Sequence, residues 1–299
     1  MKRALIPQGS GGLTIYLPKR WVARKGLEGG DQVDVFESDT KLVIGAAAAK
    51  DREKEITITK ENRGDVQTLL THAYRTGAER IVLRGVDEKL LPQVRKTTEE
   101  LLLGFELARQ DDTVTLENVF EPVQEKYDAV LRRLFLIIKE SIELLVRNGR
   151  AGAYDAREMA SLRQRHDKYA LFCRRLLMKE LHGDDIVLSW ELLTFLVHVE
   201  HALAYCHAYA AASRLVLDAR MLALTKAFKD YFGLYYDAFY TNDMAKVHAI
   251  NDLKDRYQFG ECIKALEASR GKKTVYYAYL RELFRLVQVG SSPIVAMKA

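Results

Sequence analysis

The chain of 299 residues has little of what marks secreted and membrane proteins. Its three cysteines, Cys173, Cys206 and Cys262, are far apart in apolar helical surroundings, so we expect reduced core thiols, not disulfides or zinc ligands. The longest stretches without a charge, Ala4–Pro18 and Ala202–Ser213, are too short to span a membrane. The start has no apolar run of secretory length and no small-residue cleavage site. These absences predict a cytoplasmic protein without a membrane span.

Acidic residues are missing from the first 27 positions, although the whole chain has a formal net charge of only +5. Residues 28–119 have an acidic excess, and residues 120–299 have a basic excess. A segment with only positive charges is typical of binding to a phosphate backbone, and the alternative is a solvated basic surface without a ligand. The candidate DNA-binding residues are therefore the six cations of this segment: Lys2, Arg3, Lys19, Arg20, Arg24 and Lys25.

The pattern of apolar residues divides the chain into three predicted domains, residues 1–46, 55–119 and 120–299, with a linker at Ala46–Lys54. The first domain reads as short strands and one helix, which begins after Pro18 and ends before Gly26. The predicted elements there are the strands Ala4–Ile6, Leu13–Leu17, Gln32–Glu37 and Lys41–Ile44 and the helix Lys19–Lys25.

The second domain alternates strands and helices, which predicts a small sheet with helices packed on it. Its expected elements are the strands Ile56–Thr59, Arg80–Arg84, Phe105–Ala108 and Thr113–Leu116 and the helices Gly64–Thr76 and Glu88–Leu103. The third domain has a period of 3.6 and predicts six long helices, grouped as two three-helix units with a weak internal repeat. The fold class is therefore multidomain α+β. The helices are expected at Val130–Leu145, Ala153–Leu181, Ile186–Leu215, Asp218–Tyr240, Asp243–Ser269 and Thr274–Val289.

Three segments together resemble a known family. The run from Gly11 to Val22, with Gly26-Leu-Glu-Gly-Gly-Asp31 after it, resembles the AbrB/SpoVT swapped-hairpin domain. Residues 73–77, 80–83 and 103–106 resemble the connector of archaeal proteins that fuse such a domain to a PhoU-like bundle, and the helical half resembles the PhoU repeat in layout. The resemblance implies a phosphate uptake regulator that controls transcription and forms a homodimer through its N-terminal hairpins. Few apolar residues in 45 positions also argue for a partner chain.

The PhoU resemblance also implies pairs of carboxylates one helical turn apart that hold metal clusters. Here the matching positions read Arg163…Asp167, Asn251…Asp255, Glu200-His201…Ala204 and Phe284-Arg285…Gln288, so each pair has lost at least one carboxylate. We therefore predict no such cluster and no cofactor. The weak alternative is a different metal site formed by His198, Glu200, His201 and Asp167, together with His166 and His207.

Two further patterns in the helical half are expected to be structural. The aromatic residues Phe228, Tyr231, Phe232, Tyr235 and Phe239 follow helical spacing and predict a packed core. The doublets Arg132-Arg133 and Arg174-Arg175 are expected to face solvent.

The sequence contains no nucleophile–base set, no phosphate-binding glycine loop and no intact metal motif, so it does not predict an enzyme. The favoured function is a dimeric DNA-binding regulator of phosphate homeostasis, in which the helical domain receives a signal or a partner. The alternative is a PhoU-like adaptor whose bundle binds a transporter or a signalling protein and whose first domain serves mainly for dimerisation.

Overall fold

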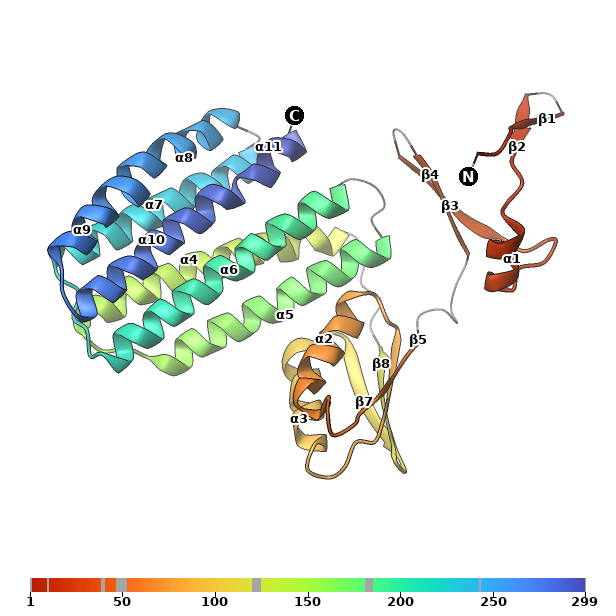
Figure 1. Cartoon of the computed structure of the whole chain (residues 1–299), viewed down its shortest axis with the longest axis horizontal. Helices are drawn as coiled ribbons and strands as arrows, with labels where there is room; N and C mark the ends of the chain where they lie inside the picture. The colour runs from red at the N-terminus through yellow and green to blue at the C-terminus, as the bar shows by residue number, and fades with distance from the viewer. Residues whose placement is uncertain are drawn as a thin grey trace. The chain divides into compact units, whose positions relative to one another are not determined.

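The computed structural model describes residues 2–9, 11–38, 41–46, 53–119, 125–180, 185–241 and 243–298 (Figure 1). The chain divides into two compact units, Met1–Asp51 and Arg52–Ala299, of which the second contains both the small sheet and the helical bundle. It is a mixed α+β structure. Most of the predicted linker, residues 47–52, lies outside the described residues.

The first unit consists of two antiparallel hairpins and one helix. The helix α1 has the predicted bounds, Lys19–Lys25, because its two ends are fixed locally: Pro18 is extended before the first turn, and Gly26 closes the helix with a φ of 63°. The first hairpin is displaced from its predicted strands, since it forms around the turn at Gly9 and Gly11. Its strands are β1, Ile6–Gln8, and β2, Gly12–Thr14, and the second hairpin pairs β3, Val33–Ser38, with β4, Lys41–Ala46.

The second unit begins with a four-stranded sheet in the order β5-β6-β8-β7, in which only β5 and β6 are parallel. The predicted alternation of strands and helices is confirmed. The second helix starts later than predicted, because the Asp87 carboxylate accepts the backbone N–H groups of Lys89 and Leu90 and holds a turn there. The elements are β5, Glu53–Thr57; the 3-10 turn η2, Arg63–Asp65; α2, Val66–Arg75; β6, Arg80–Arg84; α3, Leu91–Leu101; β7, Phe105–Gln110; and β8, Thr113–Asn118.

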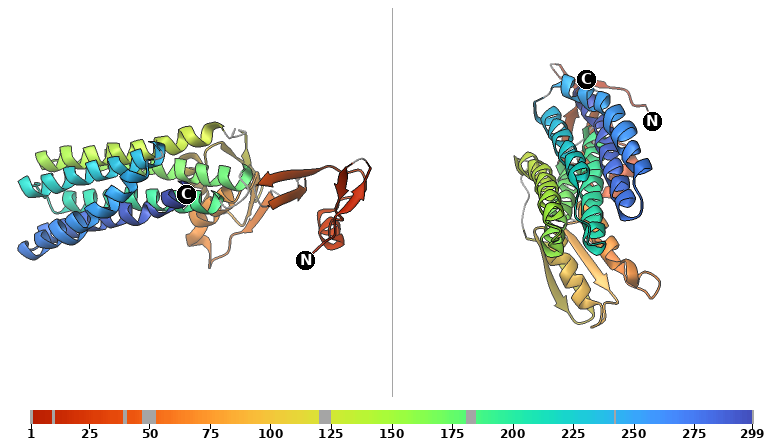
Figure 2. Two further views of the ribbon diagram at one scale, coloured as in Figure 1. Left: turned by 90° about the horizontal axis from the view of Figure 1, so that it is seen from above. Right: turned by 90° about the vertical axis from the view of Figure 1, so that its left-hand side faces the viewer.

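The helical bundle follows the sheet in the same unit. Figure 2 shows its long helices running alongside one another. The helices α4, α5 and α6 pack together, as do α7, α8, α9 and α10, and the contacts of α6 with α10 and of α4 with α7 join the two groups. The helices are α4, Glu125–Ala151; α5, Ala156–Glu180; α6, Asp185–Ala212; α7, Ala219–Thr241; α8, Met244–Arg256; α9, Cys262–Ala268; α10, Lys272–Gly290; and α11, Ser292–Lys298.

The bundle differs from its prediction at one internal position. The expected single helix Asp243–Ser269 contains a five-residue π segment, η3, at Tyr257–Glu261, which separates α8 from α9. Its first residue, Tyr257, stacks on Phe284 with ring centroids 5.0 Å apart, so the wider turn packs against α10. The short final helix α11 was not predicted.

The core of the bundle confirms the aromatic stripe. Phe228, Tyr231, Phe232 and Tyr235 are buried, and Phe239 is half-buried against the same core. All three cysteines are buried and free, as predicted. Among the described residues, Ile186–Ala212 is long and apolar enough to cross a membrane, but the core helix of a soluble protein meets the same criteria, and α6 packs against α4, α5 and α10.

Candidate nucleic-acid interface and buried polar sites

The six predicted DNA-binding cations are all exposed side chains of the first unit. Lys2 and Arg3 precede β1, and the other four lie on α1. Arg24 and Lys25 are in the last turn of α1, where positive charge interacts favourably with the helix dipole. Lys19 and Arg20 are in its first turn, where positive charge is unfavourable, so their presence is not explained by helix stability.

Five of these six cations lack an ionic partner in the described part of the chain. Among the described residues, Lys2, Arg3, Lys19, Arg20 and Arg24 make no ion pair. The nearest acidic residues in sequence are Glu28 and Asp31, and the Asp31 carboxylate accepts the backbone N–H of Glu28 at 2.7 Å. An exposed guanidinium without a carboxylate neighbour keeps all its donors available for phosphate oxygens.

The described side chains of the first unit form no buried core. None of the side chains that the structure describes between residues 2 and 46 is buried. Apolar side chains are exposed instead, by between 40% and 68%: Leu5, Ile6, Leu13, Ile15, Tyr16, Val35 and Leu42. So much exposed apolar surface on a small unit marks an interaction surface.

The four weak metal candidates do not converge. His201 Nε2 lies 2.8 Å from Asp167 Oδ1 between α6 and α5, whereas Glu200 is buried on the side of α6 that faces α4. His198 is exposed in a groove between α6 and α10. In the described parts of the chain, no three His, Cys, Asp or Glu side chains are grouped so that they could share an ion. The alternative metal site is therefore not assembled by these residues.

Glu200 and His166 are instead isolated in the core of the bundle. Ser141 Oγ donates to Glu200 Oε1 at 2.8 Å, and Oε2 has no partner. Burial raises the pKa of Glu200 to about 8, so the acid is mostly protonated at neutral pH. Burial likewise lowers the pKa of His166 to about 3, and neither of its ring nitrogens is hydrogen-bonded. At neutral pH His166 is thus neutral and Glu200 is mostly so.

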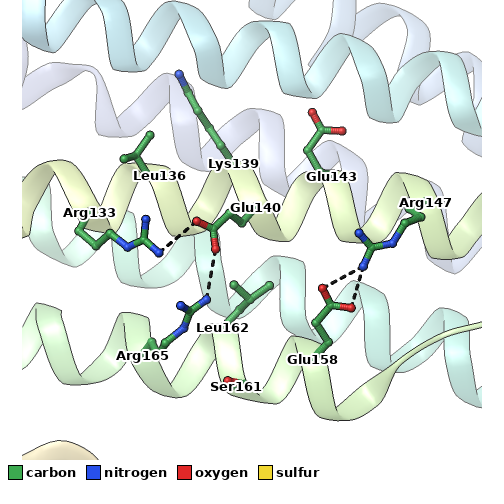
Figure 3. A pocket seen from close by; sticks show the side chains of 10 residues that line it. All are labelled: Arg133, Leu136, Lys139, Glu140, Glu143, Arg147, Glu158, Ser161, Leu162 and Arg165. Atoms are coloured by element: carbon green, nitrogen blue, oxygen red, sulfur yellow. Dashed lines mark hydrogen bonds and ion pairs between the residues drawn. The ribbon is translucent and has the colours of Figure 1, made fainter.

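A groove between α4 and α5, of about 520 Å³, shows how the bundle uses its surface cations (Figure 3). The Glu140 carboxylate lies between two guanidinium groups, 3.3 Å from Arg133 and 3.2 Å from Arg165. Arg147 Nη2 donates to both oxygens of Glu158, at 2.9 and 2.7 Å. The arginines of this groove are therefore neutralised by acidic neighbours, unlike those of the first unit.

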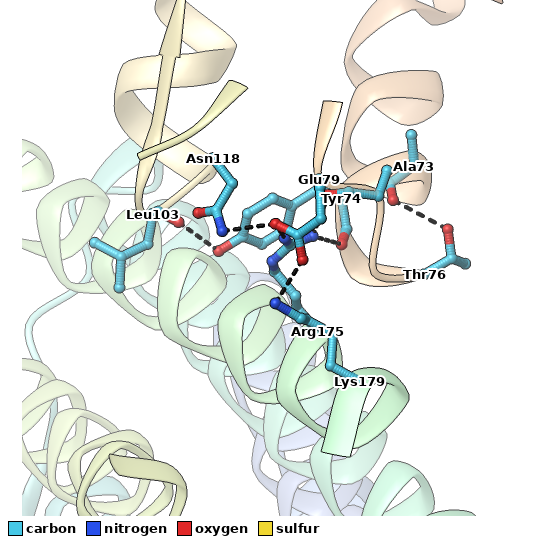
Figure 4. Close-up of polar contacts among 9 residues, drawn as sticks. Ala73, Tyr74, Thr76, Glu79, Leu103, Asn118, Arg175 and Lys179 are labelled. Atoms are coloured by element: carbon cyan, nitrogen blue, oxygen red, sulfur yellow. Dashed lines mark hydrogen bonds and ion pairs between the residues drawn. The ribbon is translucent and has the colours of Figure 1, made fainter. Parts of the chain in front are cut away.

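Arg175 corrects the prediction that the second arginine doublet faces solvent. It is only 1% exposed and joins the bundle to the sheet layer (Figure 4). Its guanidinium donates to Glu79 at 3.0 Å, to the carbonyl of Tyr74 at 3.1 Å and to the carbonyl of Ala78. Lys179 Nζ also lies 2.5 Å from Glu79.

Arg174 is half-buried and donates to a threonine hydroxyl on α6. No sequence pattern indicated that α5 packs against two layers.

Comparison with known proteins adds no assignment, because no family model, no curated protein and no solved structure matches the chain.

Proposed function

We propose that the protein is a cytoplasmic, dimeric DNA-binding transcriptional regulator, of the phosphate uptake type, whose helical bundle receives a signal or a partner. The observation that carries the proposal is the set of exposed cations in the first unit, five of which form no ion pair among the described residues. The AbrB-like and PhoU-like sequence features support the type of regulator, and phosphate enters through them alone.

The same unit supports dimerisation. Its apolar side chains are exposed and none of its described side chains is buried, so a second copy would supply the missing core. Two copies bring twice six cations to one assembly. Neutralising DNA phosphates with these cations releases counterions, so the affinity must fall steeply as salt is added.

The test is fluorescence anisotropy of labelled duplex DNA with the full chain, at several salt concentrations between about 50 and 200 mM. The double variant Arg3→Ala/Arg20→Ala should bind more weakly and show a shallower dependence on salt. Arg150→Ala/Arg157→Ala is the matched control, because it removes two exposed cations from the bundle and should bind like the unmodified chain. Equal salt slopes for the two double variants would remove Arg3 and Arg20 from the interface.

The adaptor remains the second candidate function, because the exposed apolar side chains of the first unit fit dimerisation whether or not DNA is bound. It predicts a dimer with no measurable affinity for duplex DNA. Sedimentation velocity and the anisotropy titration on one sample separate the two functions.

A further inference from the structure

The strand β7 forms one edge of the four-stranded sheet. Val119 N–H donates to the carbonyl of Gly104 at 2.8 Å, which fixes the hydrogen-bonded positions of the β7–β8 ladder. Because these positions alternate along an antiparallel pair, Glu106 and Ala108 bond to β8, whereas the backbone groups of Leu107 and Arg109 point away from it. Among the residues that the structure describes, none bonds to these outward groups, so the outer edge of β7 offers donors and acceptors with the spacing of a strand.

Charges on the outer face of the sheet form a row that ends at this edge. Glu53 of β5 pairs with Arg80 of β6, which pairs with Glu117 of β8, and their ion pairs measure 3.2 and 2.9 Å. Glu106 of β7 lies directly opposite Glu117, so the last two charges of the row are both negative. Like charges directly across a ladder are destabilising. Glu106 makes no ion pair among the described residues, so the row lacks a cation beyond it.

A hollow of about 230 Å³ lies on the opposite face, between α3 and β7. Phe105 and Leu107 of β7 give it an apolar side, and Thr98 of α3 is buried beside them. The charged residues Arg95, Glu99 and Glu106 complete its lining. A strand added to β7 would place alternate side chains on the two faces of the sheet. The residue beside Leu107 would therefore enter the hollow, and the residue beside Glu106 would lie on the outer face.

We infer that the β7 edge binds an extended polypeptide segment of a partner protein by strand addition. The segment carries a lysine or arginine opposite Glu106 and, next to it in sequence, an apolar residue that fills the hollow between α3 and β7. The backbone groups of Leu107 and Arg109 provide the hydrogen bonds, and the charge row selects the cation. The inference concerns the second unit and does not depend on DNA binding.

The test selects peptides from a random phage-displayed library on the immobilised full chain, then measures the affinity of selected peptides for variants. Arg109→Pro removes an outward N–H without removing a bond to β8, and it should weaken peptide binding about tenfold. Arg109→Ala is the matched control, since it loses the same ion pair with Glu88 but keeps the N–H, and should bind within about twofold of the unmodified chain. When the selection is repeated on Glu106→Lys, the enriched peptides should carry an acidic residue in place of the basic one opposite position 106.

Each other outcome overturns the inference. No enriched peptide, or equal binding by Arg109→Pro and Arg109→Ala, would show that the edge is not the binding surface. A basic preference that persists in Glu106→Lys would contradict the assigned contact. A lower molecular mass of Arg109→Pro in solution, compared with Arg109→Ala, would identify the occupant of the edge as a second copy of this chain and not a partner segment.

Discussion

Arg20 in the first unit and Arg165 in the bundle are both exposed arginines on helices, but their surroundings differ. Arg165 lies 3.2 Å from Glu140, whereas Arg20 makes no ion pair among the described residues and lies where the dipole of its own helix disfavours it. The bundle therefore uses its cations to neutralise its own acidic groups. In the first unit, Lys2, Arg3, Lys19, Arg20 and Arg24 make no ion pair among the described residues, which is expected of a surface that binds an external anion.

The two parts also differ in what is buried. The first unit buries none of its described side chains, while the bundle buries ionisable groups such as Arg175, Glu200 and His207. Substitutions in the bundle should therefore change stability, and substitutions of the basic residues in the first unit should change binding. The following variants test this division, from the largest expected change in the free energy of unfolding to the smallest.

Arg175→Ala should have the largest effect. It removes three hydrogen bonds made by a buried guanidinium, to Glu79 and to the carbonyls of Tyr74 and Ala78. Hydrogen bonds of a charged group contribute about 1.5–3 kcal/mol each, so we expect a loss of about 3–5 kcal/mol although Glu79 keeps Lys179 as a partner. Urea denaturation followed by circular dichroism measures the loss. Arg165→Ala is the matched control and should cost less than about 1 kcal/mol, because its pair with Glu140 is exposed. Similar losses in the two variants would contradict the role assigned to Arg175.

Glu200→Gln should stabilise the protein in a pH-dependent way. The pKa of Glu200 is about 8 when folded, above its ordinary value of 4.5, so the unmodified protein loses stability as pH rises from 4.5 to 8. Glutamine can accept the Ser141 hydrogen bond and does not ionise. The variant should match the unmodified protein near the lower pH and exceed it by on the order of 4 kcal/mol at the higher one. Thermal melts across this range would refute the prediction if the difference did not depend on pH.

Asn148→Ala should cost about 2 kcal/mol, because it leaves His207 Nε2 buried without its partner at 3.0 Å. The hydrogen bonds Asn148–His207 and Ser141–Glu200 each join residues that are 59 positions apart in sequence. Asn148 follows Ser141 by seven residues on α4, and His207 follows Glu200 by seven residues on α6. Seven residues are two helical turns, so the two polar contacts lie on one seam of the parallel helices α4 and α6 and fix their register. Urea denaturation of Asn148→Ala, His207→Ala and the double variant measures the coupling between the two side chains, and additive losses would exclude the hydrogen bond as the cause.

Local signals were sufficient to predict some elements from the sequence. Pro18 and Gly26 fixed both ends of α1, and the aromatic spacing from Phe228 to Tyr235 identified a buried face. Periodicity could not show that Arg175 is buried, because it reports that α5 has an apolar face but not that a second layer covers another side of the helix. It also missed the π segment at Tyr257–Glu261, where helical spacing continues on both sides of a single wide turn.

The candidate sites also divide into those that local sequence indicates and those that depend on tertiary packing. The six cations could be identified from the sequence because a run of one charge sign needs no tertiary information. The isolation of Glu200 could not, because the sequence places it beside His201, whereas the structure directs the two side chains toward different helices. Adjacent residues on a helix point about 100° apart, so sequence neighbours of this kind seldom share one site.

Arg20→Ala should have the smallest effect on stability and a large effect on binding. Because Arg20 is exposed and makes no ion pair among the described residues, its removal should change the free energy of unfolding by less than about 0.5 kcal/mol. Loss of one phosphate contact from each of two copies should lower the slope of log affinity against log salt by about 2. Denaturation and anisotropy on the same preparation measure both quantities. A variant that is less stable but binds DNA with an unchanged slope would place Arg20 with the structural arginines of the bundle, and the distinction between the two units would no longer hold.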